Sequence, residues 1–381
     1  MSALTSEQTA IRDMTREFVR KEVAPFAAEW DRSATVPLPT LRKAGALGFF
    51  GVGVPPEWGG SGADFVSYIL MTEELAYGDA GVCNMISATN AFAWKVRDHG
   101  TPAQKARFLR PVAAGEALAC LMYTEPQAGS DAANQQTRAV RHGDRWVING
   151  TKSFITNAGT PMSGFVIITA LTGQREGMRE VSTILVPNGT PGYVIGRPYR
   201  KIGWHASDTR ELVFSDCRVD RACLLGPRGD GVRHFLSILD GGRIGVAALG
   251  VGLAQGCLDI SLAYAHERKT FGQPIARYQA IQFMLAELAT QVQAARLLTY
   301  EAALLKDNDE SYSKAAAMAK LFASELAVKA ADVAVQVHGG LGYMDDTPAA
   351  RFYRDAKILT LGEGTSEIMK IVIARRLGLG S

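Results

Sequence analysis

Apolar residues in the first third of the chain recur at the spacing of an amphipathic helix. Leu4, Ile11, Met14 and Phe18 illustrate the pattern at the start of a helical stretch near residues 5–32. The same spacing, interrupted by Pro and Gly, predicts further helices near residues 39–47, 64–77, 81–98 and 102–113. We therefore predict an all-helical N-terminal domain over residues 1–116.

The pattern changes near residue 117 to short runs rich in β-branched and aromatic residues. Runs such as ALACLMYT, GFVIITAL and VSTILVP are separated by turn formers, including HGD at 142–144. Asn149-Gly150 is a strong hairpin signal, so we expect a turn there as well. Residues 117–226 are predicted to form a central β domain, either a sandwich or a small barrel.

Long amphipathic segments rich in Ala and Leu return from about residue 229. They predict helices near residues 231–266, 275–306, 311–337 and 365–377. Helices of this length normally pack side by side, so residues 227–381 are predicted to form a C-terminal helical bundle. The fold class is therefore mainly α with a central β domain.

Charge and cysteine content narrow the function further. The net charge is +3, from 41 basic and 38 acidic residues, which gives no reason to expect a nucleic-acid partner. The five cysteines form no C-x-x-C pair and have no His at metal-ligand spacing, which favours reduced thiols in the cytoplasm and no metal site. The N-terminus lacks the apolar core of a secretory signal, and no stretch approaches the roughly 18 apolar residues that a membrane span needs.

Two candidate ligand-binding segments lie in the predicted β domain. The first, Tyr123–Asp131, offers hydroxyl groups and backbone amides beside a glycine, although an ordinary loop between strands would look similar. The second, Asn149–Asn157, alternates so that Phe154 and Thr156 share one face, which could carry a flat ligand. A routine amphipathic strand would show the same alternation in this second segment.

Three further segments lie in the predicted helical bundle. Glu267–Gly272 places a basic pair beside an aromatic ring, which suits a phosphate and a ring but also simple capping of a helix C-terminus. Gln336–Gly342 is glycine-rich, so its main chain can approach a phosphate closely. Glu363 lies between two glycines, and Thr365 or Ser366 is a natural N-cap for the last helix.

In this order on an α-β-α chain, these segments resemble the acyl-CoA dehydrogenase family. YTEPQAGSD, NGTKSFITNAG, ERKTFG, QVHGGLGY and EGTSEI are similar to the signatures of that family, and the resemblance spans nearly the whole chain. It implies an N-terminal helical domain, a middle β-barrel or sandwich, and a C-terminal four-helix bundle. It also implies FAD as cofactor, an acyl-CoA substrate, an electron-transfer flavoprotein as electron acceptor, and a homotetramer built as a dimer of dimers.

The resemblance also implies a role for individual residues. Glu363 matches the catalytic base that removes the α-proton while the β-hydride passes to flavin N5, giving the trans-2-enoyl-CoA. Some family members carry their base on the long helix instead, at the position of Gly242, where this chain has no carboxylate. The residues implied for FAD are Tyr123, Thr124, Gly129, Ser130, Phe154, Thr156, Arg268, Phe271, Gln279, Gln336, His338, Gly339, Gly340, Thr365 and Glu367. Those implied for the substrate are Ser130, Asp240, Arg243, Gly362 and Gly364.

The resemblance further implies that two subunits share each cofactor. Arg268, Phe271 and Gln279, with the Gln336–Gly340 loop, match the part of the FAD site that holds the diphosphate and adenosine of the neighbouring subunit's cofactor. Assembly would then be needed for cofactor binding as well as for stability.

One departure from the family pattern bears on the substrate. Many relatives carry Tyr where this chain has Gly362, and the loss of that ring should widen the pocket for a short or branched acyl group. Leu361 could fill the same space instead. The sequence also leaves open a substrate linked to an acyl carrier protein and an oxidase that uses O₂. A non-catalytic flavin protein associated with nucleic acid is disfavoured by the charge balance and by Glu363.

Overall fold

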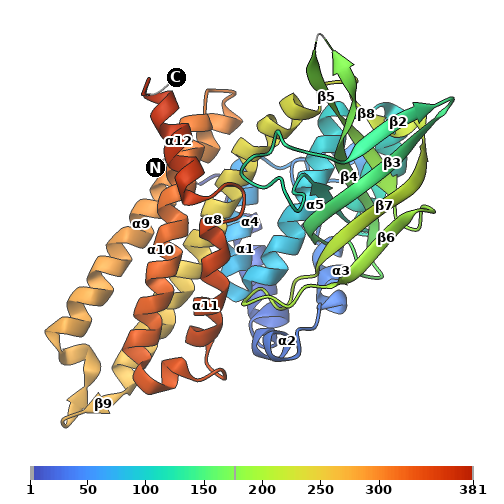
Figure 1. The fold of residues 1–381 in the computed structure, drawn as a ribbon. Coiled ribbons are helices and arrows are strands. Elements are labelled where there is room, and N and C mark those ends of the chain that lie inside the picture. The colour runs from blue at the N-terminus through green and yellow to red at the C-terminus, as the bar shows by residue number, and fades with distance from the viewer. Residues whose placement is uncertain (1–3, 176, 380–381) are drawn as a thin grey trace.

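The computed structural model describes residues 4–175 and 177–379, in the order helical, β, helical that the sequence predicts (Figure 1). Side-chain caps begin several helices: the Asp64 carboxylate accepts from the Ser67 N–H, and the Asp79 carboxylate accepts from the Val82 N–H. The first helices are α1 (Ser6–Phe18), α2 (Ala27–Ser33), α3 (Leu38–Ala46), α4 (Phe65–Gly78), α5 (Ala80–His99), α6 (Pro102–Gln104) and α7 (Arg110–Ala113). Shorter helical turns are η1 (Val19–Val23), η2 (Pro56–Trp58) and η3 (Lys105–Leu109).

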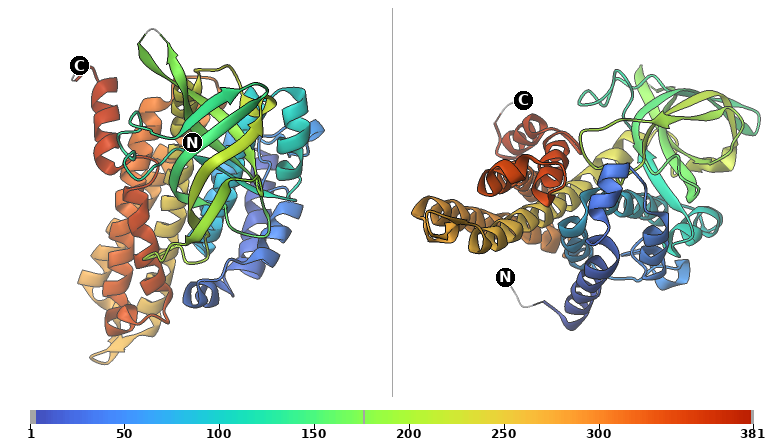
Figure 2. Two further views of the ribbon diagram at one scale, coloured as in Figure 1. Left: turned by 45° about the vertical axis from the view of Figure 1, so that its right-hand side comes forward. Right: turned by 90° about the horizontal axis from the view of Figure 1, so that it is seen from below.

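The central strands form one sheet that curls strongly, as the view from below shows (Figure 2). Its order is β6-β7-β3-β2-β4-β5-β8, and β1 pairs in parallel with β4. The strands are β1 (Leu118–Met122), β2 (Arg138–His142), β3 (Arg145–Thr156), β4 (Ser163–Arg175), β5 (Met178–Pro187), β6 (Tyr193–Pro198), β7 (Thr209–Asp220) and β8 (Leu224–Leu225), with η4 (Arg221–Cys223) before β8.

The expected hairpin turn at Asn149-Gly150 is wrong. Both residues lie inside β3, where the register against β7 shifts between Ile148 and Gly150. A Cβ on Gly150 would lie 2.5 Å from Thr137 Oγ1, so glycine is needed here for the close approach of β3 to the residue that precedes β2. The turn between β2 and β3 falls at Gly143-Asp144, within the other predicted signal.

The C-terminal helices form a bundle beside the first helical part. They are α8 (Gly231–Glu267), α9 (Gln279–Asp307), α10 (Ser313–His338), α11 (Pro348–Ala356) and α12 (Ser366–Arg376). Between them lie β9 (Lys269–Thr270), β10 (Gln273–Pro274), η5 (Ile275–Arg277), η6 (Gly339–Tyr343) and η7 (Lys357–Thr360). The sequence pattern did not predict α11, which Thr347 caps by accepting from the Ala350 N–H.

Helix α8 is the central element of the bundle and packs against α10, α4 and α9. Of the helices described, it is the one that is long and apolar enough to cross a membrane, so the expectation that no stretch reaches this threshold is wrong. In the fold, however, 67% of its most apolar window is buried. This is the burial expected of a core helix covered by its neighbours.

Two hydrophobic cores hold the molecule together. One runs continuously through both helical parts, from Phe18 in α1 through Ile244 in α8 to Leu359 in η7. The other fills the curled sheet and reaches Phe92 in α5 and Phe108 in η3. Because the helical parts share a core, the faces of α4, α5, α8 and the segment before α12 are fixed relative to one another.

Candidate active site

Glu363 lies in the short loop between η7 and α12, in a left-handed backbone conformation with φ of 54°. Gly364 follows with φ of 94°, and Thr365 then caps α12 by accepting from the Ile368 N–H at 3.3 Å. A left-handed conformation is costly for a residue other than glycine and persists only where the surroundings impose it. The backbone therefore fixes the direction in which the Glu363 side chain points.

The Glu363 carboxylate lies against a glycine of α8. A Cβ on Gly242 would be 3.0 Å from Glu363 Oε2, and a Cβ on Gly245 would be 3.0 Å from the Tyr68 hydroxyl on α4. Glycines on this face of α8 thus leave room for a carboxylate from one side and a tyrosine from the other. Residues 242 and 363, far apart in the sequence, meet at one point.

Close packing of protein around the carboxyl group raises the pKa of Glu363 by desolvation, while the charges of Arg243 and Lys320 act in the opposite direction. Among the described residues Glu363 forms no salt bridge, although the residue as a whole is still exposed to solvent. Both nearby cations are committed elsewhere: Arg243 donates to Asp240 at 2.6 Å, and the Lys320 ammonium donates to the Gly364 carbonyl at 2.5 Å. The carboxylate therefore stays unpaired in a partly desolvated setting.

Two tyrosine hydroxyls lie near this carboxylate. Burial, with a contribution from the Glu363 charge, raises the pKa of Tyr68 to about 12 and raises that of Tyr123 as well. The Tyr123 hydroxyl is buried with no hydrogen-bond partner among the described residues, and its ring lies 3.9 Å from that of Phe235, centroid to centroid. Both hydroxyls remain protonated at neutral pH and can act as donors.

A buried ion pair organises the loop after β1. Lys152 Nζ is 2.8 Å from Glu125 Oε1, and both side chains are almost completely buried. Lys152 also donates to the Tyr123 carbonyl at 3.3 Å, and Glu125 accepts from the Gln136 and Thr137 N–H groups. This network fixes the segment that holds Thr124, whose carbonyl accepts from the Ser153 N–H at 2.9 Å.

The end of β3 presents an aromatic ring beside a hydroxyl group. Phe154 has φ of 62° at a register shift in β3, and 66% of it is exposed. Thr156 accepts from the Asn84 amide of α5 at 3.2 Å, and Ile155 between them is buried. Gly129 and Ser130, in the loop after β1, are also exposed. The predicted shared face of Phe154 and Thr156 agrees with this burial pattern.

The remaining predicted residues of the bundle lie at its opposite end, around β9 (Figure 1). Phe271 has φ of 48° and is 98% exposed. The Arg268 N–H donates to the Tyr264 carbonyl, and the Tyr264 ring stacks on His338 at 4.3 Å. His338 lies about 27 Å further along α10 than Lys320, at ~1.5 Å per residue. Arg268, Phe271, Gln279 and the loop from Gln336 through Gly339 to Gly340 therefore do not join Glu363 within one protomer.

Comparisons with known proteins agree with this architecture. The chain matches the acyl-CoA dehydrogenase N-terminal domain at residues 5–116, the middle domain at 120–217 and the C-terminal domain at 229–378. A probable acyl-CoA dehydrogenase, YngJ, of Bacillus subtilis is 48% identical over 98% of both chains. The chain belongs to the acyl-CoA dehydrogenase family.

Two solved structures also superpose on nearly the whole chain. Butyryl-CoA dehydrogenase from Megasphaera elsdenii is 38% identical, with a TM-score of 0.95 and 99% of each chain covered. A structure described as the electron transferring flavoprotein of Acidaminococcus fermentans is 42% identical, with a TM-score of 0.96 and 99% of each chain covered. This dehydrogenase is accordingly an FAD-dependent oxidoreductase with the predicted three-part fold.

Residues at the end of β3 and at the end of β1 have the chemistry to hold a flavin. Phe154 offers an exposed ring, and Thr156 a half-buried hydroxyl close to it in sequence. The buried, unpartnered Tyr123 hydroxyl is a donor that a ligand can satisfy. Thr365 and Glu367, which the resemblance implies for FAD, lie at the start of α12, where Glu367 borders a surface hollow of about 310 Å³.

Sequence reasoning missed several residues of this site, above all Lys320, Tyr68 and Asn84. Lys320 had a readable signal: it stands on the apolar face of α10 with Ala316 and Ala323, where an alanine would be expected. Tyr68 and Asn84 gave no such signal, because each belongs to the site only through packing between helices.

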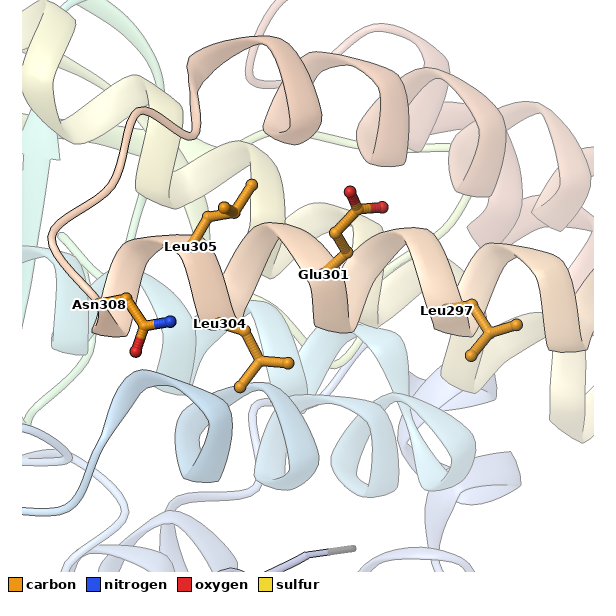
Figure 3. A pocket seen from close by; sticks show the side chains of 5 residues that line it. All are labelled: Leu297, Glu301, Leu304, Leu305 and Asn308. Carbon is orange, nitrogen blue, oxygen red and sulfur yellow. The ribbon is translucent and has the colours of Figure 1, made fainter. Parts of the chain in front are cut away.

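A second surface hollow, of about 320 Å³, lies along α9. Figure 3 shows the side chains that line it along the last turns of α9 and its C-cap: Leu297, Glu301, Leu304, Leu305 and Asn308. It contains none of the predicted site residues, so it does not alter the location of the candidate active site.

Proposed function

We propose that this enzyme removes the α-proton and β-hydride of a short acyl-CoA thioester, giving the trans-2-enoyl-CoA, with Glu363 as the base. One observation carries this proposal: Glu363 is an unpaired, partly desolvated carboxylate fixed against Gly242. Such a carboxylate is a stronger base than one in water, because desolvation disfavours its charged form.

The same loop offers a donor for the thioester carbonyl. Within the described residues, the Glu363 N–H donates to no carbonyl or side chain. Its hydrogen bond to the carbonyl oxygen would stabilise the negative charge that develops there as the α-proton leaves. Bound FAD supplies the acceptor for the β-hydride and its two electrons. Glu363 then holds the α-proton on its carboxyl group until product leaves.

An aromatic cluster beside Glu363 supports a short acyl chain. The rings of Phe65, Tyr68 and Trp94 lie 4.7–5.4 Å apart, centroid to centroid. Phe65 and Tyr68 pack against Gly241 and Gly245 of α8, on either side of Gly242. These rings fill space between α4, α5 and α8 that a long acyl chain would need. The likeness to a butyryl-CoA dehydrogenase agrees with this limit.

Gly362 supports tolerance of a branched acyl group. A Cβ at this position would meet only the Ile358 carbonyl, at 3.5 Å, so there is room beside the base. Leu361 is 51% exposed and lines the hollow that Glu367 borders, which argues against its filling that room. We include branched acyl-CoA thioesters in the proposed substrate class.

The proposal extends to a homotetramer in which Arg268, Phe271, Gln279 and the Gln336–Gly340 loop complete a neighbour's FAD site. Their distance from Glu363 in one protomer and the exposure of Phe271 and Phe283, 98% and 66%, support it. An electron-transfer flavoprotein is the proposed electron acceptor. Five buried, free cysteines support a cytoplasmic location.

The test is anaerobic mixing of purified enzyme with butyryl-, octanoyl-, isobutyryl-, 2-methylbutyryl- and isovaleryl-CoA. We expect the short or branched esters to bleach the visible flavin band. A flavin that no CoA ester bleaches but a carrier-protein thioester does would replace the proposed substrate, and peroxide formation during turnover would indicate an oxidase. A chain that cannot bind FAD would contradict the proposal altogether.

A further inference from the structure

Lys320 is a fully buried cation in the N-terminal half of α10. It lies on a face made of alanines, including Ala316, Ala323 and Ala327, which are all buried. Removing an ammonium group from water is expensive, so a buried lysine needs a compensating interaction. The proposed mechanism above assigns it no task.

The compensating interaction is a single hydrogen bond to the active-site loop. Lys320 Nζ donates to the Gly364 carbonyl at 2.5 Å. In the part of the chain that the structure describes, Lys320 has no carboxylate within salt-bridge distance. Its neighbour along α10, Lys329, pairs instead with Glu287 at 2.7 Å on the surface.

The bonded carbonyl belongs to the strained turn. Glu363 and Gly364 are consecutive left-handed residues, with φ of 54° and 94°. A change in the backbone angles of these two residues would swing the Glu363 side chain away from Gly242, where the carboxylate now lies. Anchoring the Gly364 carbonyl from inside the bundle opposes that change.

We propose that Lys320 is a positioning residue for the base: it locks the left-handed Glu363–Gly364 turn and supplies a positive charge that keeps Glu363 ionised before substrate binds. This inference rests on the proposed role of Glu363. It assigns two separable functions to one ammonium group, a hydrogen bond and a charge.

The other ionisable groups around this turn are few. Arg243 of α8 is paired with Asp240, and Tyr68 and Tyr123 stay protonated. Two further acidic groups, Glu325 of α10 and Glu367 of α12, lie near Lys320 at the surface. Burial lowers the pKa of Lys320 to about 8, and the charge of Glu363 is the largest effect opposing that fall. Lys320 is therefore still mostly charged at neutral pH.

The experiment compares Lys320→Met, which removes the donor and the charge, with Lys320→Gln, which keeps a donor but removes the charge. Lys329→Met is the matched control, an α10 lysine whose partner is on the surface. For each FAD-loaded variant, kcat/KM for butyryl-CoA is measured against pH. Amide hydrogen exchange over residues 361–370 is measured in parallel.

Both Lys320 variants should move the acid limb of kcat/KM to higher pH, by about one unit, because loss of a nearby cation makes the carboxylate harder to ionise. Lys320→Met should also speed exchange around the turn, by about ten-fold, and Lys320→Gln less so. Lys329→Met should change neither. An unmoved acid limb together with unchanged exchange would overturn the proposal, even if the melting temperature falls.

Failure of the proposed function would look different. If Glu363→Gln kept its activity, Glu363 would not be the base, and the acid limb would report another group. The exchange rates around Gly364 would still show whether Lys320 anchors the turn. If Lys320→Met cannot be purified in a folded form, Lys320→Gln alone is tested by the acid limb of its kcat/KM profile and by its amide exchange. Wild-type values in both measurements would overturn the proposal.

Discussion

The two sides of the candidate site are each organised by a buried lysine, but in opposite ways. On the flavin side, Lys152 is paired with the Glu125 carboxylate, which also accepts two backbone N–H groups. On the base side, Lys320 has one neutral carbonyl as its partner, and the nearby Glu363 carboxylate is left free. On the flavin side, the buried lysine and carboxylate are paired with each other. On the base side, the Glu363 carboxylate has no partner among the described residues.

The difference follows from what each side must do. A surface that only holds a cofactor gains from complete pairing, because each satisfied group makes the loop more rigid. A general base cannot be paired in the same way, since a direct ion pair would lower its pKa and compete with the substrate proton. The base loop is therefore held through its backbone, at Gly364, and its side chain stays available.

Glu363→Gln should give the largest effect. Loss of the base should lower turnover about a thousand-fold, within the usual range for general acid–base catalysis, while FAD stays bound. We would measure the rate of flavin bleaching by butyryl-CoA, with Glu310→Gln as an exposed control. Turnover close to that of the wild type would show that the unpaired carboxylate is not the base.

The same variant makes a prediction for stability. The pKa of Glu363 is raised in the fold, so its charge lowers the free energy of unfolding once the pH exceeds the unfolded-state pKa. Glu363→Gln should therefore be more stable than the wild type at pH 7 and equal to it near pH 4. Urea unfolding at both pH values measures this, and a variant less stable at pH 7 would contradict the assigned direction.

Lys152→Met should produce the next largest effect. It leaves Glu125 buried without its cation, which typically costs about 3–5 kcal/mol in the free energy of unfolding. FAD content should fall too, because the network fixes the loop that holds Thr124. The double variant Lys152→Met/Glu125→Gln should recover part of the stability. If Lys152→Met and Lys320→Met had the same free energy of unfolding, the ion-paired Lys152 and the carbonyl-bonded Lys320 would not differ as described.

Gly242→Ala should lower activity without lowering stability. The new Cβ would lie 3.0 Å from Glu363 Oε2, so the carboxylate must shift by a few tenths of an ångström. We expect kcat to fall about ten-fold, since misplacement of about 1 Å can cost ~10²-fold. Gly250→Ala is unsuitable as a control because it would meet the Ala323 carbonyl. Unchanged kcat would mean that the carboxylate position tolerates movement.

Thr365→Ala should have the smallest effect. It removes the side-chain cap of α12 and should lower the free energy of unfolding by about 1 kcal/mol. Thr365→Ser keeps the hydroxyl and should behave like the wild type in thermal unfolding. A large loss of FAD content or turnover with little loss of stability would mean that this hydroxyl also contacts FAD, as the family resemblance implies.

Sequence patterns predicted the features that depend on residues close together in the chain. Helical periodicity located the long helices, and the glycines around Glu363 correctly predicted a loop before a helix capped at residue 365. The Asn149-Gly150 signal failed because a local turn preference was overridden by the approach of Thr137 on a neighbouring segment. Tyr68 and Asn84 join the site through contacts between distant helices, which one sequence does not reveal, whereas Lys320 could have been noticed as a lysine on the alanine face of α10.

The buried position of α8 also has a consequence during synthesis. Helix α4 has already left the ribosome when α8 emerges, but α10 begins roughly 45 residues later, a delay of a few seconds at about 5–20 residues per second. During that interval one side of α8, a helix apolar enough to cross a bilayer, is uncovered. This side can then contact chaperones, membranes and other nascent chains. The yield of native enzyme in a cell should thus depend on how fast the ribosome passes from α8 to α10, and not only on the stability of the finished fold.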